Sequence, residues 1–251
     1  MFYQSLFKWI WMVSLLLMAV VYYYKNDLPP PEYYDLSMLQ GPIQTPTTKK
    51  PFVIEANHQD YTIIPRFEYD LTGVVVTYNN ASGFNDIWHY DIWKDFINVR
   101  DLCLIWGSNV GTGVYKNMSF SSDSWHCWYG WQDNKTGQSF VYTTLSNNHL
   151  VTNDNQIKAK LLSAEIGDVV HLKGQLVNYI NNETGGYRIS SVKITDRGEG
   201  ACKVVYLDEF QVLKKANVRL RHWYMLLKWV SIASLIGFLS FFIFAPFKIS
   251  R

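Results

Sequence analysis

The chain has 251 residues, of which 48% are hydrophobic and 18% are charged, and its 23 Lys and Arg against 21 Asp and Glu give a net charge of +2. This composition excludes a disordered chain and a collagen-like repeat, and the length is that of one ordinary domain with small additions. Three cysteines without a Cys-x-x-Cys pair also exclude a disulfide-stapled miniprotein and a zinc ribbon.

The first segment, residues 1–25, is predicted to be an N-terminal transmembrane anchor. Trp9 to Tyr24 contains sixteen residues without a charge, and a helix of that length rises about 24 Å. To cross the bilayer, the preceding residues must join the helix and Lys8 must extend its amine to the headgroups. A cleaved signal peptide is the alternative, but Val20, Val21 and three tyrosines stand where a peptidase needs small residues.

The next tract, residues 26–66, is predicted to be a Pro-rich linker or extended arm. It contains LPPPEYY, GPIQTPTT and KKPF and has no sustained apolar period. The run Pro29-Pro30-Pro31 is stiff, so we expect it to hold the following domain away from the bilayer.

Residues 67–213 are predicted to form a mainly β globular domain. Short apolar or alternating runs such as EYDLTGVVVTYN, DLCLIWG and SFVYTTL are separated by Gly, Asn, Asp and Ser, which is typical of antiparallel strands. Two segments are predicted to be helical instead. The first covers 85–99, with Asp86 as its cap and three apolar residues at four-residue spacing, and the second covers 153–167 and ends at Gly167.

The segment 166–180, IGDVVHLKGQLVNYI, carries the clearest strand pattern. Val170, Leu172, Gly174 and Leu176 share one face, and a glycine inside a strand allows a barrel to bend sharply. A helix leading into such a strand is typical of OB-like barrels, although a β-sandwich or an SH3-like barrel gives nearly the same pattern. The expected fold is mainly β, an OB-like or related small barrel with about two short helices, flanked by one transmembrane helix at each end.

The C-terminal part is predicted to contain a basic membrane-proximal segment, 214–228, followed by a transmembrane helix, 229–247. The second stretch has nineteen uncharged residues, about 28 Å of helix. A helix over 214–228 would place basic residues among the lipid headgroups, and a membrane-flanking turn explains the pattern equally well. The lipid-proximal residues are Lys214, Lys215, Arg219, Arg221 and Lys228.

Charge is distributed unevenly along the chain. Between Asp27 and Leu213 there are 21 acidic against 14 basic residues, a net of −7, and the other nine basic residues lie in or beside the apolar ends. An acidic body argues against nucleic acid as a partner. Basic residues near the spans, counted alone, favour a cytoplasmic body, but a long connection is translocated regardless of charge. We therefore expect an inner-membrane protein with a periplasmic body and both termini in the cytoplasm.

Three stretches together resemble a family of uncharacterised bacterial membrane-anchored envelope proteins. They are VRDLCLIWG at 99–107, LSNNHLV at 145–151, and GDVVHLKGQLV followed by TDRGEGACKVVYLDEFQV at 195–212. The resemblance covers roughly 68–213 and implies a place in the envelope, with no activity to carry over. The Pro-Arg-Arg tract expected before the His-Leu segment is absent, so no shared anion site is inferred. The distinctive positions are occupied by Trp106, Gly107, His149, Gly174 and Cys202.

The cysteine and histidine spacing predicts no metal site, no cofactor and no catalytic residue. His126 and Cys127 are adjacent, so in a strand they point to opposite faces and cannot bind one ion together. Cys103 and Cys202 lie in apolar strands, where cysteine behaves as a small buried hydrophobe. An exported body allows one disulfide, for which Cys103 with Cys202 is the predicted pair, leaving Cys127 free.

Aromatic residues gather in SWHCWYGW, where Trp125, Trp128 and Trp131 are either core residues or a stacking platform for a ligand. With Trp106 and His149 they form the predicted ligand or functional surface.

The sequence favours a non-catalytic interaction or assembly component of a larger membrane complex, with other membrane or envelope proteins and the lipid bilayer as partners. One alternative is a membrane-tethered hydrolase or thiol enzyme that uses His149 with Cys127 or Cys202. Another is lipid or glycan binding through the tryptophan cluster and the basic segment.

Overall fold

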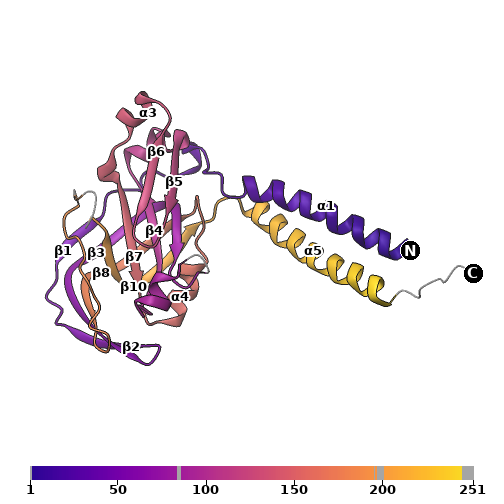
Figure 1. The fold of residues 1–251 in the computed structure, drawn as a ribbon. Helices are drawn as coiled ribbons and strands as arrows, with labels where there is room; N and C mark the ends of the chain where they lie inside the picture. Colours follow the sequence, from indigo (N-terminus) through magenta and orange to yellow (C-terminus); the bar gives the residue numbers. More distant parts are fainter. Residues whose placement is uncertain (1, 84–85, 195, 197–200, 245–251) are drawn as a thin grey trace, which may run out of the picture. The chain divides into compact units, whose positions relative to one another are not determined.

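A computed structural model describes residues 2–83, 86–194, 196 and 201–244 (Figure 1). The chain divides into two compact units. One consists of Met1–Asp27 together with Asn217–Arg251, and the other is Leu28–Ala216.

The terminal unit consists of two helices, α1 (Phe2–Tyr24) and α5 (Val218–Phe244), which lie side by side. Both are long and apolar enough to cross a membrane, as predicted from the sequence. They run antiparallel: Phe7 near the start of α1 stacks on Phe241 near the end of α5, with ring centroids 5.7 Å apart. Gly237 permits this approach, because a Cβ there would lie 2.8 Å from the Phe7 ring.

The predicted boundaries in the C-terminal part are wrong. Residues 214–228 are not a separate segment, because α5 begins at Val218 and continues without a break into the apolar stretch. Lys214 ends strand β10 in the body, where its amine lies 3.9 Å from the centroid of the Tyr33 ring. Arg219, Arg221 and Lys228 belong to α5. The last predicted helix residues, 245–247, lie outside the described residues.

The body is built on an eight-stranded sheet. Its five longest strands pair with one another in a closed ring. Strand β3 pairs with β4, β4 with β7, β7 with β10, β10 with β8, and β8 again with β3. All these pairs are antiparallel except β7 with β10, which is parallel. The strands are β3 (Gln59–Asn80), β4 (Asn98–Ile105), β7 (Leu145–Val151), β8 (Val169–Asn181) and β10 (Lys203–Lys214).

Two strands explain how the ring bends. The 22-residue β3 pairs with β8 from Tyr61 to Val74 and with β4 from Val74 to Asn80. The two pairings therefore overlap only at Val74. In β8, Gly174 lies against the backbone of β10, and a Cβ there would collide with the carbonyl of Tyr206. The glycine predicted to allow a bend is therefore required by this close approach.

Shorter elements complete the body. Three strands extend the sheet: β1 (Ile43–Pro46), β2 (Phe52–Ala56) and β9 (Tyr187–Arg188). A separate hairpin contains β5 (Met118–Ser122) and β6 (Cys127–Trp131). The short helices and helical turns are η1 (Pro31–Tyr33), η2 (Trp88–Ile92), α2 (Ser108–Gly111), η3 (Val114–Asn117), α3 (Asn134–Ser139), η4 (Tyr142–Thr144) and α4 (Asn155–Leu162).

The predicted face of β8 lies in the main core. Val170, Leu172 and Leu176 are fully buried, and leucines and valines of β3, β4 and β10 pack with them. Trp106 is also part of this core, so it does not belong to the predicted ligand surface.

The predicted linker, 26–66, is wrong from Leu28 onward, because this tract folds as part of the body. The tract shows no periodic apolar pattern because isolated residues anchor it to the body. Leu39 is fully buried, and the Tyr34 hydroxyl donates to the carbonyl of Gly167 at 3.1 Å. The tract also supplies β1, β2 and the first residues of β3. The proline run is held against the body, since the Tyr115 hydroxyl donates to the carbonyl of Pro29 at 2.5 Å.

Of the two predicted helices, one is confirmed in a shorter form. Helix α4 (Asn155–Leu162) begins behind Asp154, whose carboxylate accepts from the backbone N–H groups of Gln156 and Ile157. The segment 85–99 is not a helix, although Asp86 caps the single turn η2. Lys94 at φ 54° follows this turn, and the chain enters β4 at Asn98. Residue 85 lies outside the described residues.

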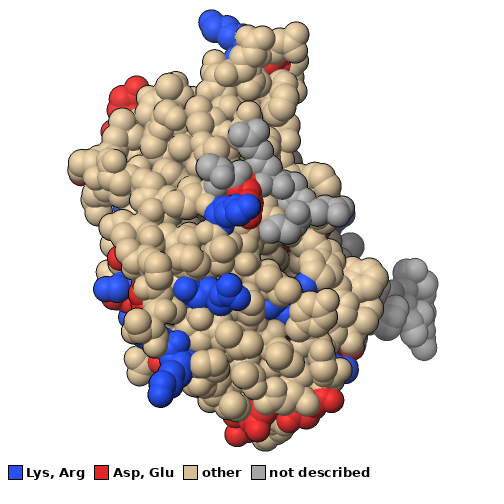
Figure 2. Space-filling model, turned by 90° about the vertical axis from the view of Figure 1, so that its left-hand side faces the viewer, with Lys and Arg blue, Asp and Glu red and all other residues tan. Residues whose placement is uncertain are grey.

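Charged side chains are dispersed on the face of the body shown in Figure 2. Most of this face is uncharged, basic side chains stand apart from one another, and acidic atoms gather at its lower end.

Candidate functional site

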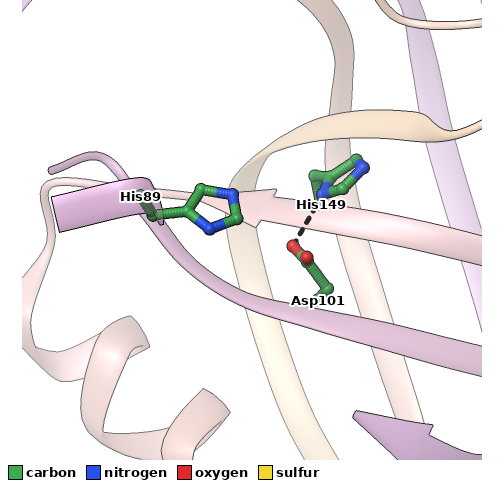
Figure 3. A group of neighbouring side chains, drawn as sticks. All are labelled: His89, Asp101 and His149. Carbon is green, nitrogen blue, oxygen red and sulfur yellow. Dashed lines mark hydrogen bonds and ion pairs between the residues drawn. The ribbon is translucent and has the colours of Figure 1, made fainter. Parts of the chain in front are cut away.

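Strand register brings three reactive side chains to one face of the sheet. Asp101 in β4 lies opposite His149 in β7, and Lys203 in β10 lies opposite Asn148, so Cys202 is placed next to Asn147. Since side chains alternate along a strand, Cys202 and His149 project on the same side. Figure 3 shows the His149 ring meeting Asp101, with Nδ1 of the histidine 2.7 Å from Oδ1 of the carboxylate.

The Cys202 thiol lies on the same side of the sheet as the His149 ring. The cysteine is half-buried and free, and it lies close enough to the His149 imidazole for the charge of His149 to lower its pKa. The Asn147 amide donates to Sγ at 3.6 Å, and as a thiol Cys202 donates to the carbonyl of Trp125 at 3.4 Å. A cysteine and a histidine–aspartate pair thus share one face, the residue types with which a base activates a nucleophile and a third group orients the base.

The surroundings favour the charged forms of both reacting groups. Burial of the His149 ring opposes protonation, but Asp101 and Cys202 outweigh it and raise the pKa of His149 to about 10. Burial also opposes ionisation of the thiol, yet the hydrogen bond and the positive charge of His149 lower the pKa of Cys202 below its ordinary value. A thiolate beside an imidazolium is the nucleophilic state of a cysteine.

A second layer of side chains holds Asp101. The amide of Asn98 donates to Oδ1 of Asp101 at 3.1 Å and to Nε2 of His89 at 2.8 Å. Because an amide nitrogen only donates, Nε2 of His89 is the acceptor, and its Nδ1–H donates to Asp86 at 2.8 Å. Asp86 comes from the turn before η2, so this loop positions the aspartate of the site.

A possible metal site is formed by His89, Asp101 and His149. Their ligand atoms all lie within 4.8 Å of one another, and two imidazoles with a carboxylate suit zinc. Oδ2 of Asp101 is buried and accepts no hydrogen bond from the described residues. However, both nitrogens of His89 and Nδ1 of His149 are already hydrogen-bonded, and a metal would have to displace Asn98. The geometry therefore favours a hydrogen-bonded network over a metal centre.

A cavity of about 470 Å³ opens beside Cys202. One wall comes from the hairpin β5–β6, whose Trp128 and Trp131 are about half exposed. Lys203 adds a buried amine, and burial lowers its pKa to about 8. Further lining residues include Cys127, Tyr129, Tyr142, Leu145, Ser146 and Asn147. The thiol can thus meet a substrate that carries an apolar group.

The structure corrects the predicted disulfide. Cys103 is bonded to Cys127, with their Cα atoms 5.8 Å apart, and Cys202 is left free. The bond ties the hairpin β5–β6 to β4, a contact between distant parts of the chain that no spacing in the sequence reveals.

The predicted surface residues separate into different places. Trp128 and Trp131 line the cavity at Cys202, whereas Trp125 lines a second cavity. His149 shares a face of the sheet with Cys202, one of the two cysteines considered for it, and Cys127 is taken up in the disulfide. Sequence reasoning did not connect Asp101 to His149. The one available signal was that Asp101, His149 and Cys202 lie in three of the stretches that carry the resemblance.

Comparison of the chain with models of known protein families, with curated proteins and with solved structures gives no match.

Proposed function

We propose that this protein is a membrane-anchored thiol enzyme that hydrolyses an acyl ester or amide. The observation that carries the proposal is that Cys202 and the hydrogen-bonded pair His149–Asp101 share one face of the sheet at the edge of an aromatic cavity. The sequence alone favoured a non-catalytic component, because it did not place these three residues together.

The chemistry follows from the position of each group. The Cys202 thiolate adds to the acyl carbon, and the bond to the leaving group breaks as the His149 imidazolium gives that group its proton. A water molecule then attacks the thioester while His149 takes a proton from it, which releases the acid and restores the thiolate. Asp101 is a positioning residue that fixes the ring through Nδ1.

The Asn147 amide donates to the reacting sulfur, and it is expected to donate to the oxygen that becomes negative during attack. The walls formed by Trp128 and Trp131 favour an apolar acyl chain as the group bound next to the thiol.

The proposed setting is the bacterial envelope, with the body in the periplasm and both termini in the cytoplasm. Two helices that can cross a membrane support the two-span arrangement. The Cys103–Cys127 disulfide supports an oxidising compartment for the body. We also propose that the body is an OB-like barrel. The support is the ring of five strands, with α4 between β7 and β8 and a parallel β7–β10 pair.

The test is capture of the acyl-enzyme. The full chain in detergent is mixed with 4-nitrophenyl octanoate, quenched in acid and analysed by intact-protein and peptide mass spectrometry. The expected result is one octanoyl group on Cys202, absent from Cys202→Ala. His149→Ala should acylate at least about a hundredfold more slowly, as expected for removal of a general acid–base group. An adduct on surface lysines only, or equal acylation of Cys202 in His149→Ala, would contradict the proposal.

A second candidate, the assembly component of a larger envelope complex, is favoured by one observation. Trp128, Trp131 and Tyr142 are 54%, 48% and 42% exposed around the same cavity, and exposed aromatic clusters are typical of protein interfaces. Affinity purification in mild detergent should then recover stoichiometric membrane partners that are lost from a Trp128→Ala, Trp131→Ala double variant. Recovery of the same partners by that variant would exclude this surface.

A further inference from the structure

We infer that the body carries a second site, a pocket that binds a neutral carbohydrate. This inference does not depend on the proposed thiol chemistry. The pocket has a volume of about 310 Å³ and shares no lining residue with the cavity at Cys202. Its polar and aromatic lining includes Trp93, Asp95, Trp125, Tyr179, Asn181 and Arg188.

Segments that are far apart in the sequence build the pocket. Trp93 and Asp95 lie in the loop between η2 and β4, Tyr179 lies near the end of β8, and Arg188 belongs to β9. Trp125 comes from the turn between β5 and β6, and its ring centroid lies 4.4 Å from that of Trp93.

The aromatic rings and the arginine form one stacked group. The guanidinium carbon of Arg188 lies 4.0 Å from the centroid of the Trp125 ring and 4.7 Å from that of Trp93. Stacking fixes the plane of the guanidinium, so its donors are held at the pocket instead of moving freely in solvent. Trp125 is still 41% exposed, which leaves indole surface for a ligand.

Asp95 supplies the observation that points to a ligand. Its side chain is 8% exposed. Oδ2 accepts from the Tyr179 hydroxyl at 2.6 Å and lies 3.6 Å from Nε of Arg188. Asp95 lines the pocket, and its Oδ1 is buried and accepts no hydrogen bond from any described residue. A buried carboxylate oxygen without a donor is unfavourable, and a donor from a ligand would satisfy it.

The pairing of opposite charges selects the class of ligand. Asp95 would repel a carboxylate or phosphate, and Arg188 would repel an amine. A hydroxyl group both donates and accepts, so one hydroxyl can donate to Asp95 while a neighbouring one accepts from Arg188. A sugar ring presents several hydroxyls around its edge and an apolar face to the indole rings. A neutral carbohydrate therefore fits both the charges and the aromatic walls.

The binding test uses the full chain in a detergent without a sugar headgroup, such as lauryldimethylamine oxide, because maltoside detergents would compete. Tryptophan fluorescence and isothermal titration calorimetry are recorded with three neutral probes: maltotriose, cellotriose and tri-N-acetylchitotriose. Saturable binding of at least one probe is expected. Absence of binding by all three at millimolar concentration would overturn the inference, as would tighter binding of a sulfated sugar than of every neutral probe.

Matched variants locate the site. Asp95→Asn keeps the shape of the side chain, and it should weaken binding about tenfold, the effect of one charge-assisted hydrogen bond. Arg188→Gln should weaken binding to a similar degree, which gives a second readout if Asp95→Asn fails to fold. Trp128→Ala and Cys202→Ser alter the other cavity and should bind the probe as wild type does. Unchanged affinity in both pocket variants would place the sugar elsewhere.

Discussion

Two histidine–aspartate pairs connect neighbouring strands of the sheet, and their surroundings differ. His149 lies 2.7 Å from Asp101 between β7 and β4, and His171 lies 2.9 Å from Asp70 between β8 and β3. The side chains of the first pair are 11% and 1% exposed, whereas those of the second are 23% and 37% exposed. The first pair also shares its face of the sheet with the free thiol of Cys202, which lines a cavity. The same two residue types at nearly the same distance thus form a candidate site only where burial and a nucleophile accompany them.

The largest difference between the two pairs is expected in the free energy of unfolding when each aspartate is removed. Asp101→Ala leaves a charged imidazole buried without its partner and is expected to lower the free energy of unfolding by about 3–5 kcal/mol. Asp70→Ala removes a partly exposed pair and should change it by less than about 1 kcal/mol. Thermal or denaturant unfolding of the two variants in the same detergent measures both effects. Equal losses would show that burial does not distinguish the pairs.

The disulfide beside the buried pair gives the next largest effect. Cys103 lies in β4, two residues after Asp101, and the bond to Cys127 closes a loop with a sequence separation of 24. A loop of this size corresponds to about 3 kcal/mol of stabilisation. Cys103→Ser with Cys127→Ser should therefore lower stability by about that amount.

Peptide mapping without reductant provides the control for the disulfide. It should show Cys103 linked to Cys127 and Cys202 unlinked. A link from Cys202 to either of the other two cysteines would remove the free thiol from the buried pair and from the proposed site.

The third contrast between the pairs concerns pH. In the fold the pKa of His149 is raised from 6.5 to about 10. Because the folded value is the higher one, protonation stabilises the fold fully below pH 6.5, and this stability is lost as the pH rises to about 10. The measurement is made in a Cys202→Ser background, so that the thiol does not titrate and Asp101 is left as the group that raises the pKa of His149. His149→Gln in the same background should remove most of the alkaline loss, and His171→Gln should retain it. A larger alkaline loss of stability in His149→Gln than in His171→Gln would contradict the assignment of this pH dependence to His149.

Parts of this arrangement were predictable from local signals. The alternation around Gly174 predicted the buried face of β8, and Asp154 marks the start of α4 by its side-chain chemistry. Both signals act within a few residues. The tract 26–66 was misassigned because isolated anchors such as Leu39 bury it without a periodic pattern.

The candidate site was only partly predictable. His149 and Cys202 were recognised as reactive residue types, but their meeting depends on the parallel β7–β10 register across more than fifty residues. Asp101 looks like any acid in an apolar strand until β4 is paired with β7. The segment 85–99 has helical spacing, yet Ile97 and Val99 are fully buried beside or within β4, and this tertiary burial overrides the local preference.

The most direct test of the central claim is the pH dependence of Cys202 alkylation by iodoacetamide. If His149 holds Cys202 as a thiolate, the folded wild-type chain should react rapidly at pH 6 and change little up to pH 8. His149→Ala should then react at least about tenfold more slowly at pH 6, and His171→Ala should match wild type. A wild-type rate that instead rises with a midpoint near the ordinary thiol pKa of about 8.5, with both variants alike, would contradict the account.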